Sequence, residues 1–96
     1  MISHVVIFRT RQKDKVSLLL EGARKLERIE VVKSFHCGVP LPSDRPVVDD
    51  FFDVAIVVGL DSAADLPVYA KHPIHLDFLE NCVKTSGAKT TVFDIE

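Results

Sequence analysis

Three side chains that can move or donate a proton, Tyr69, His72 and His75, lie within seven positions of one another, with Pro73 between the two histidines. A neutral imidazole can take up a proton near pH 7. A phenol can donate a hydrogen bond to a carbonyl oxygen on which negative charge develops. This cluster therefore predicts proton-transfer chemistry on a carbonyl compound, with His75 as the base and Tyr69 as the hydrogen-bond donor.

The elements that position this cluster follow from Pro73. A residue before proline avoids the helical conformation, so one helix should end at His72. Proline is favoured as the first residue of a helix, so a second helix should begin at Pro73 and carry His75 in its first turn. The helix start and apolar surroundings both disfavour the imidazolium, which predicts a lowered pKa for His75. We expect His72 to act as a cap or strut at the break and, with His4, to be a ligand-binding residue.

The sequence predicts no metal and no cofactor. Histidines at 72 and 75 have a suitable spacing for ligands, but the intervening Pro73 breaks the helical face that they would share. The two cysteines, Cys37 and Cys82, have neither a Cys-x-x-Cys spacing nor partner ligands, and we interpret both as small buried hydrophobic residues. His36 has no supporting context.

The first third of the chain predicts a strand, a helix and a second strand. Residues 2–10 alternate in the manner of a strand that is apolar on both faces. Asp14 can cap a helix that begins at Lys15 and ends near Arg28. Within it, Gly22 lowers helix stability by about 1 kcal/mol relative to alanine unless packing compensates. A second strand is expected over 32–39.

The remaining elements are predicted in this order: a proline-rich loop over 39–46, a central strand over 51–58, a tight turn at 59–61, a broken helix from residue 62, and a strand over 90–95 after Gly87. Ser62 and Asp65 fit a capping box at the helix start. Pro67 removes a backbone donor there, so an irregular or 3₁₀ beginning is expected.

The order β-α-β-β-α-β predicts a ferredoxin-like α+β protomer, a single domain over residues 1–96, with four antiparallel strands and both helices on one face. The helices cannot cover Val54, Ile56 and all their neighbours. Large exposed apolar patches are typical of interaction surfaces. We therefore expect a second copy on the open face, giving a two-fold homodimer with a barrel-like interior.

Composition excludes several function classes. Ninety-six residues with a net charge of −2 give no reason to expect nucleic acid or an anionic membrane as a partner. The cluster Arg9, Arg11, Lys13 and Lys15 is interpreted as a solvated strand end. An RNA-binding sheet would need a basic, glycine-containing aromatic strand, whereas residues 49–56 are acidic and lack glycine. No apolar run is long enough to span a bilayer and the N-terminus lacks secretory features, so a cytoplasmic protein is expected.

Three segments resemble a known family. The strings His4-Val-Val-Ile-Phe8, Tyr69-Ala-Lys-His-Pro-Ile-His75 and Val92-Phe-Asp94 are similar to those of the stress-responsive dimeric α+β barrel (Dabb) family, and the resemblance covers essentially the whole chain. It implies a ferredoxin-like protomer and a barrel dimer. One branch, the proteins similar to olivetolic acid cyclase, closes a polyketide chain by an aldol-type step that uses a tyrosine and a histidine. Those roles fall on Tyr69 and His75, with His4 in the same pocket.

Two functions of different classes remain open. The first is a pocket for a small, mostly apolar carbonyl compound, in a cofactor-free cyclase or isomerase. The second is a non-catalytic homo-oligomeric stress protein. A monooxygenase of a related dimeric barrel family is a further alternative that no sequence feature selects. An open cavity that reaches Tyr69 and His75 favours the first function, and a cavity filled by the protein's own side chains favours the second.

Overall fold

The structure, a computed structural model, describes residues 1–96, in which strands and helices follow the predicted order. The strands are β1 (Ile2–Arg9), β2 (Ser34–Gly38), β3 (Val54–Leu60) and β4 (Lys89–Ile95). The helical segments are η1 (Lys13–Lys15), α1 (Val16–Arg24), η2 (Lys25–Arg28), α2 (Asp65–Lys71), α3 (Pro73–Phe78), η3 (Leu79–Val83) and α4 (Lys84–Ser86). None of the helices is both long and apolar enough to cross a lipid bilayer.

The strands form one antiparallel sheet in the order β2-β3-β1-β4. The two central strands, β1 and β3, are those whose sequences are apolar on both faces, which confirms the predicted central position of β3. Val6 of β1 pairs with Ile56 of β3 on one side and with Val92 of β4 on the other. This is the ferredoxin-like arrangement that the sequence predicts.

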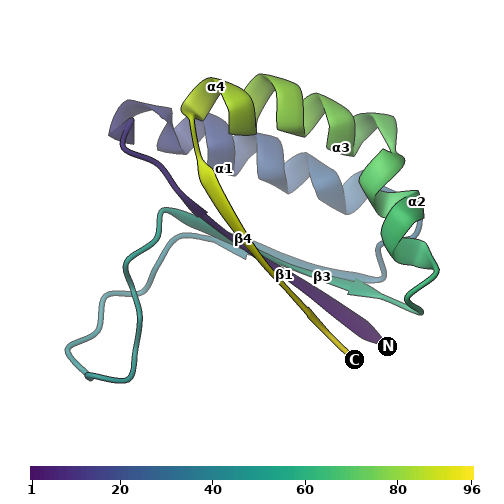
Figure 1. The fold of residues 1–96 in the computed structure, drawn as a ribbon, viewed down its shortest axis with the longest axis horizontal. Helices are drawn as coiled ribbons and strands as arrows, with labels where there is room; N and C mark the ends of the chain where they lie inside the picture. Colours follow the sequence, from purple (N-terminus) through teal and green to yellow (C-terminus); the bar gives the residue numbers. More distant parts are fainter.

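All the helices lie on one face of the sheet, and the long loop between β2 and β3 projects away from it (Figure 1). The core forms between that face and the inward sides of the helices, and it includes Phe8, Leu19, Leu26, Ile56, Val58 and Tyr69. The other face of the sheet is open. It exposes apolar side chains that include Val57, 40% exposed, and Phe93, 56% exposed.

The helices cover only part of β3, as the sequence predicts. Val54 and Ile56 are 0% and 2% exposed, so the helices do cover them. Side chains alternate along a strand, so the intervening Ala55 and Val57 face the open side instead. The open apolar face of the sheet is formed by this second set of residues.

Both predicted boundaries of β3 also change. β3 begins at Val54 rather than at Phe51, because the three residues before it contact the end of β1: the Phe51 carbonyl accepts from Arg9, and the Asp53 carboxylate accepts from the amide of Thr10. At its other end β3 continues through Gly59 and Leu60, so the turn predicted at 59–61 begins only after the strand.

Neither the cap predicted at Asp14 nor the capping box predicted at Ser62 forms. At the start of α1, Asp14 lies inside the short 3₁₀ turn η1 and makes no cap hydrogen bond. Near α2, the amide of Asp65 donates to the backbone carbonyl of Ser62 at 3.0 Å rather than to its hydroxyl, so the capping box is absent and the helix begins at Asp65. This 3₁₀-type bond agrees with the irregular start predicted from Pro67. The predicted exit is confirmed, since Gly87 ends α4 with a φ of 65°.

Candidate active site

The break between α2 and α3 brings Tyr69 and His75 together, as predicted. His72 has a φ of −62° and a ψ of 139°, which ends α2, and Pro73 occupies the first turn of α3. The ring centroids of Tyr69 and His75 are 4.9 Å apart. The ring of His4, from the middle of the sheet, lies 5.5 Å from that of Tyr69 on another side. Three side chains from separate elements thus meet at one point.

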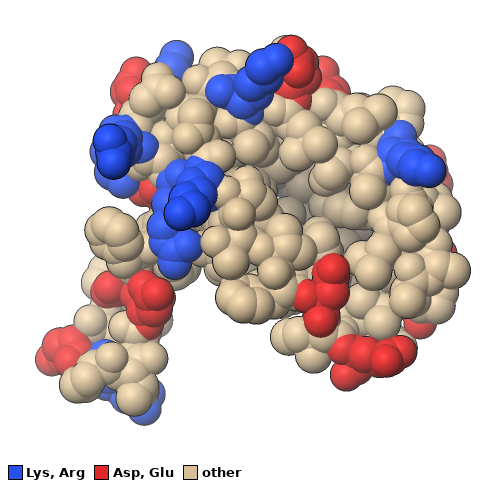
Figure 2. Space-filling model, in the orientation of Figure 1, with Lys and Arg blue, Asp and Glu red and all other residues tan.

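These side chains line a cavity of about 380 Å³ between the sheet and the helices. Strands β1, β3 and β4 form one wall, and α2, α3 and the start of η3 form the other. Nine of its fourteen lining residues are hydrophobic, so its wall is mostly apolar. Figure 2 shows a hollow between β4 and the helices on the side where this cavity lies. His4, Tyr69, His75 and Asp94 provide most of its polar atoms.

The Tyr69 hydroxyl is buried and has no hydrogen-bond partner. The side chain is 1% exposed, and burial raises the pKa of Tyr69 above its usual range, so the phenol stays protonated. Buried polar atoms in native proteins nearly always have a partner. Tyr69 lines the cavity, so its unpartnered hydroxyl is a candidate donor to an acceptor atom bound there.

His75 is held as a neutral imidazole with a defined tautomer. Its Nδ1 lies 2.9 Å from the carbonyl oxygen of Ala70, which can only accept, so Nδ1 carries the proton and Nε2 has a free lone pair. Burial lowers the pKa of His75, the Ala70 carbonyl partly offsets this by raising it, and the proximity of His4 lowers it further. The direction agrees with the one expected from the sequence, with burial as its main cause.

Asp94 is a cavity residue that sequence reasoning missed as part of the site. The β1–β4 ladder places it directly opposite His4, and its carboxylate lies 2.5 Å from His4 Nδ1. Asp94 orients the His4 ring by accepting a hydrogen bond from Nδ1–H. Only the register of β1 with β4 places this carboxylate opposite a histidine. The order of residues along the chain does not show that register.

His72 does not line the cavity. Its Nδ1 accepts from the amide of Ile74 at 3.0 Å, which caps α3, and its Nε2 lies 3.2 Å from the carboxylate of Glu30. The predicted role as a cap is confirmed. Both ring nitrogens already have partners, and the ring lies outside the cavity. The position of His72 therefore does not support the expectation that it binds a ligand there.

No group of three or more histidine, cysteine, aspartate or glutamate side chains has the arrangement of a metal site. Cys37 and Cys82 are both free thiols. Burial raises the pKa of each, which keeps them protonated and weakly nucleophilic. Cys82 is buried in the core beside Gly22, in agreement with the sequence interpretation, whereas Cys37 is only partly buried against that core.

The sequence matches the stress-responsive A/B barrel domain (Dabb) over residues 2–96. The chain belongs to the Dabb family. None of the curated proteins compared with this Dabb domain matches it.

Solved structures share its fold. A dimeric protein of unknown function from Bacteroides fragilis has a TM-score of 0.78 at 19% identity, covering 99% of this chain and 94% of that one. A dimeric ferredoxin-like protein of unknown function from Thermobifida fusca has a TM-score of 0.75 at 23% identity, covering 98% and 88%. The hydroxynitrile lyase of Passiflora edulis has a TM-score of 0.74 at 21% identity, covering 98% and 90%. At these identities the likeness shows a common fold.

Proposed function

We propose that the cavity binds a small, mostly apolar carbonyl compound and that this Dabb protein is a cofactor-free cyclase or isomerase. The observation that carries the proposal is the buried, unpartnered hydroxyl of Tyr69, which lies beside a neutral His75 in an apolar cavity. A carbonyl oxygen is the acceptor that such a hydroxyl lacks. An apolar ligand of this kind also matches the largely hydrophobic lining.

In the proposed reaction the ligand's carbonyl oxygen accepts from the Tyr69 hydroxyl. His75 Nε2 removes a proton from the carbon next to the carbonyl, and the electron pair of the C–H bond moves to give an enolate. The Tyr69 hydrogen bond strengthens as negative charge develops on the enolate oxygen. If the ligand carries a β,γ double bond, isomerisation ends when the imidazolium returns the proton to the γ carbon of the dienolate. Cyclisation ends when the enolate carbon bonds to a second carbonyl and the new alkoxide takes that proton.

Two observations favour an enzyme over a non-catalytic stress protein. The cavity holds open space beside both side chains instead of being filled by phenylalanine and leucine. The Passiflora edulis protein of similar fold is a lyase, so the fold supports an enzyme elsewhere. The resemblance of the Tyr69–His75 string to olivetolic acid cyclase-like proteins supports the same class of chemistry.

We also propose that two copies pack through their open sheet faces. Val5, Ile7, Val57 and Phe93 lie on this face together, as the register of β1 with β3 and β4 requires. The similar proteins from Bacteroides fragilis and Thermobifida fusca are dimeric, which supports a second copy as the occupant.

The enzyme proposal is tested by proton–deuterium exchange at the carbon next to the carbonyl of phenylacetone, a small apolar ketone. We expect the protein to accelerate this exchange. His75→Ala should lower the accelerated rate on the order of 10²-fold because it removes the general base. Tyr69→Phe should also lower the rate while preserving the fold, because it deletes only the hydroxyl.

His72→Asn is the matched control. It removes an imidazole three residues from His75, yet asparagine also serves as a helix N-cap, so α3 should remain intact. The control should exchange deuterium at the wild-type rate. Equal rates in wild type and His75→Ala would remove the proposed base, and equal rates in wild type and Tyr69→Phe would remove the proposed hydrogen-bond donor.

A further inference from the structure

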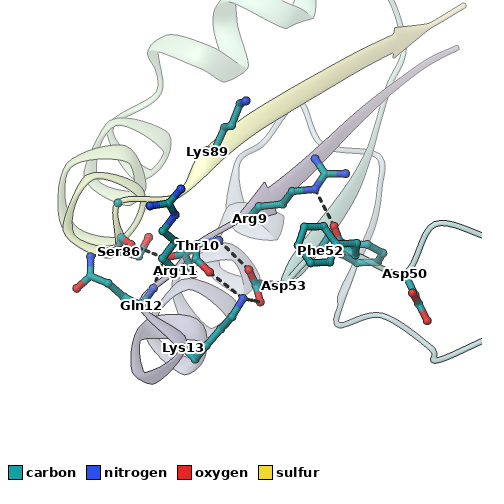
Figure 3. A pocket seen from close by; sticks show the side chains of 12 residues that line it. Arg9, Thr10, Arg11, Gln12, Lys13, Asp50, Phe52, Asp53, Ser86 and Lys89 are labelled. Atoms are coloured by element: carbon teal, nitrogen blue, oxygen red, sulfur yellow. Dashed lines mark hydrogen bonds and ion pairs between the residues drawn. The ribbon is translucent and has the colours of Figure 1, made fainter.

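A second cavity, of about 720 Å³, lies at the end of β1 remote from His4. It is bounded by the turn from β1 into α1, by residues 50–53 before β3, and by the start of β4 (Figure 3). Its only hydrophobic lining residues are Phe51 and Phe52. Four cations, Arg9, Arg11, Lys13 and Lys89, also line it, so part of the basic cluster in the sequence borders a cavity instead of only a solvated strand end.

The two carboxylates of this cavity are occupied by other groups. Asp53 accepts from the amide of Thr10 at 2.7 Å and from the ammonium of Lys13 at 2.9 Å. Burial by itself would raise the pKa of Asp53, but these two partners lower it overall. Asp50 accepts from the amide of Ser43 in the loop at 3.0 Å. Lys13 is therefore paired with Asp53, and Arg9 is paired with Asp49, which does not line the cavity.

Arg11 and Lys89 carry positive charge that no carboxylate pairs with, whereas Arg9 has one long, exposed ion pair. Arg9 donates its Nε proton to the Phe51 carbonyl at 2.7 Å, and its nearest carboxylate is the exposed Asp49, at 3.6 Å. Arg11 and Lys89 take part in no ion pair. Figure 3 shows Arg9 projecting from β1, Lys89 from β4, and Arg11 from the turn that follows β1.

The sheet itself forces two of these charges together. The β1–β4 ladder places Arg9 directly opposite Lys89, and like charges in directly opposite positions destabilise a sheet. Figure 2 shows lysine and arginine gathered over this part of the molecule. The local potential is therefore positive although the net charge of the protein is −2. A bound anion would relieve the repulsion.

We propose that this basic cavity binds a phosphate ester whose organic group is apolar. The guanidinium groups of Arg9 and Arg11 match the geometry of phosphate oxygens, and Lys89 adds a third donor. Three cations suit the double charge of a phosphate monoester better than the single charge of a carboxylate. Phe51 and Phe52 offer the apolar contact for the organic group. The site is separate from the Tyr69–His75 cavity and does not depend on its chemistry.

The test is a titration of the protein with phenyl phosphate at constant ionic strength, followed by amide NMR. Saturable shifts are expected at Arg11, Gln12 and Gly87. Inorganic phosphate should bind more weakly because it lacks the ring, and benzoate should bind more weakly because it carries one charge. Inorganic phosphate binding as tightly would overturn the apolar part of the site, and benzoate binding as tightly would overturn the assignment to phosphate.

The double variant Arg11→Gln with Lys89→Gln should weaken phenyl phosphate binding on the order of tenfold or more, because two charged donors are lost. Arg45→Gln with Lys71→Gln is the matched control, since it removes one arginine and one lysine that are also without ion pairs and lie outside the cavity. The control should bind as wild type does. Equal weakening in both variants, an absence of saturation in wild type, or shifts centred on Ala70 and His75 would each overturn the proposal.

Discussion

A histidine in water changes its charge at a pH of about 6.5, and His75 departs from that behaviour because of three neighbours. Apolar walls remove water from the ring, and His4 adds a nearby imidazole that becomes positive when protonated. The Ala70 carbonyl acts in the opposite direction by holding the Nδ1 proton. The sum favours the neutral ring, and the free lone pair is left on Nε2, the atom that a base uses.

We predict that His75 titrates below its ordinary value of 6.5. Between that value and the lower folded value, the unfolded chain binds more protons than the folded one at this residue. The contribution of His75 to stability is therefore present above the ordinary value and is lost as the pH falls through this window. NMR of the ring protons measures the folded pKa directly. A value at or above the ordinary one would contradict the burial argument.

At the scale of the elements, two interruptions in one helical region shape the cavity. The His72–Pro73 break turns the chain so that Tyr69 and His75 face the same space. Further along, η3 is a π-helical turn, and such turns are often found at functional sites. Leu79, its first residue, lines the cavity, while Cys82, near its other end, faces Gly22 of α1.

Gly22 allows this close approach of α1 to the π-helical turn. A Cβ at Gly22 would lie 2.3 Å from Cys82 Sγ and 3.1 Å from a ring carbon of Phe78. We predict that Gly22→Ala lowers the free energy of unfolding by about 1–3 kcal/mol, despite the better helix propensity of alanine. Urea denaturation measures the change.

Gly38→Ala is the control for this prediction, because a Cβ at Gly38 would meet no atom within 4 Å. It should leave stability nearly unchanged. In a Cys82→Ala background the effect of Gly22→Ala should become smaller, since the nearest clashing atom is gone. An unchanged effect in that background would show that the Cys82 thiol is not the obstacle.

At the scale of the whole molecule, the open sheet face is the surface through which we propose that two copies associate. Helices cover only one side of the sheet, so Val57, Phe93 and Ile95 remain 40%, 56% and 56% exposed. The largest apolar patches of monomeric proteins are themselves often functional. Packing against a second copy would remove these side chains from water on both protomers.

We predict that Val57→Asp abolishes the homodimer, because an unpaired charge in the interface costs several kcal/mol. Sedimentation velocity at micromolar concentration should show a dimer for wild type and a monomer for the variant. Val68→Asp, at a 52% exposed position on α2, is the matched control and should remain a dimer. A wild-type protein that sediments as a monomer would rule out the proposed assembly.

The sequence by itself was sufficient for the order of the elements, the helix break and the convergence of Tyr69 with His75. These features depend on local rules: alternation in strands, the restricted conformation of a residue before proline, and the absent amide of Pro73. The direction of the His75 pKa shift was also expected from the sequence, although part of the burial that causes it comes from the distant strands β1, β3 and β4.

Tertiary structure alone decided the contacts between distant segments. The pairing of Asp94 with His4 spans 90 positions, and that of Asp53 with Thr10 spans 43. The first depends on the strand register and the second on the course of the loop before β3. The expected caps at Asp14 and Ser62 failed because backbone carbonyls compete for the same amides, a competition that composition does not reveal. The basic cavity likewise exists only because folding places the start of β4 beside the end of β1.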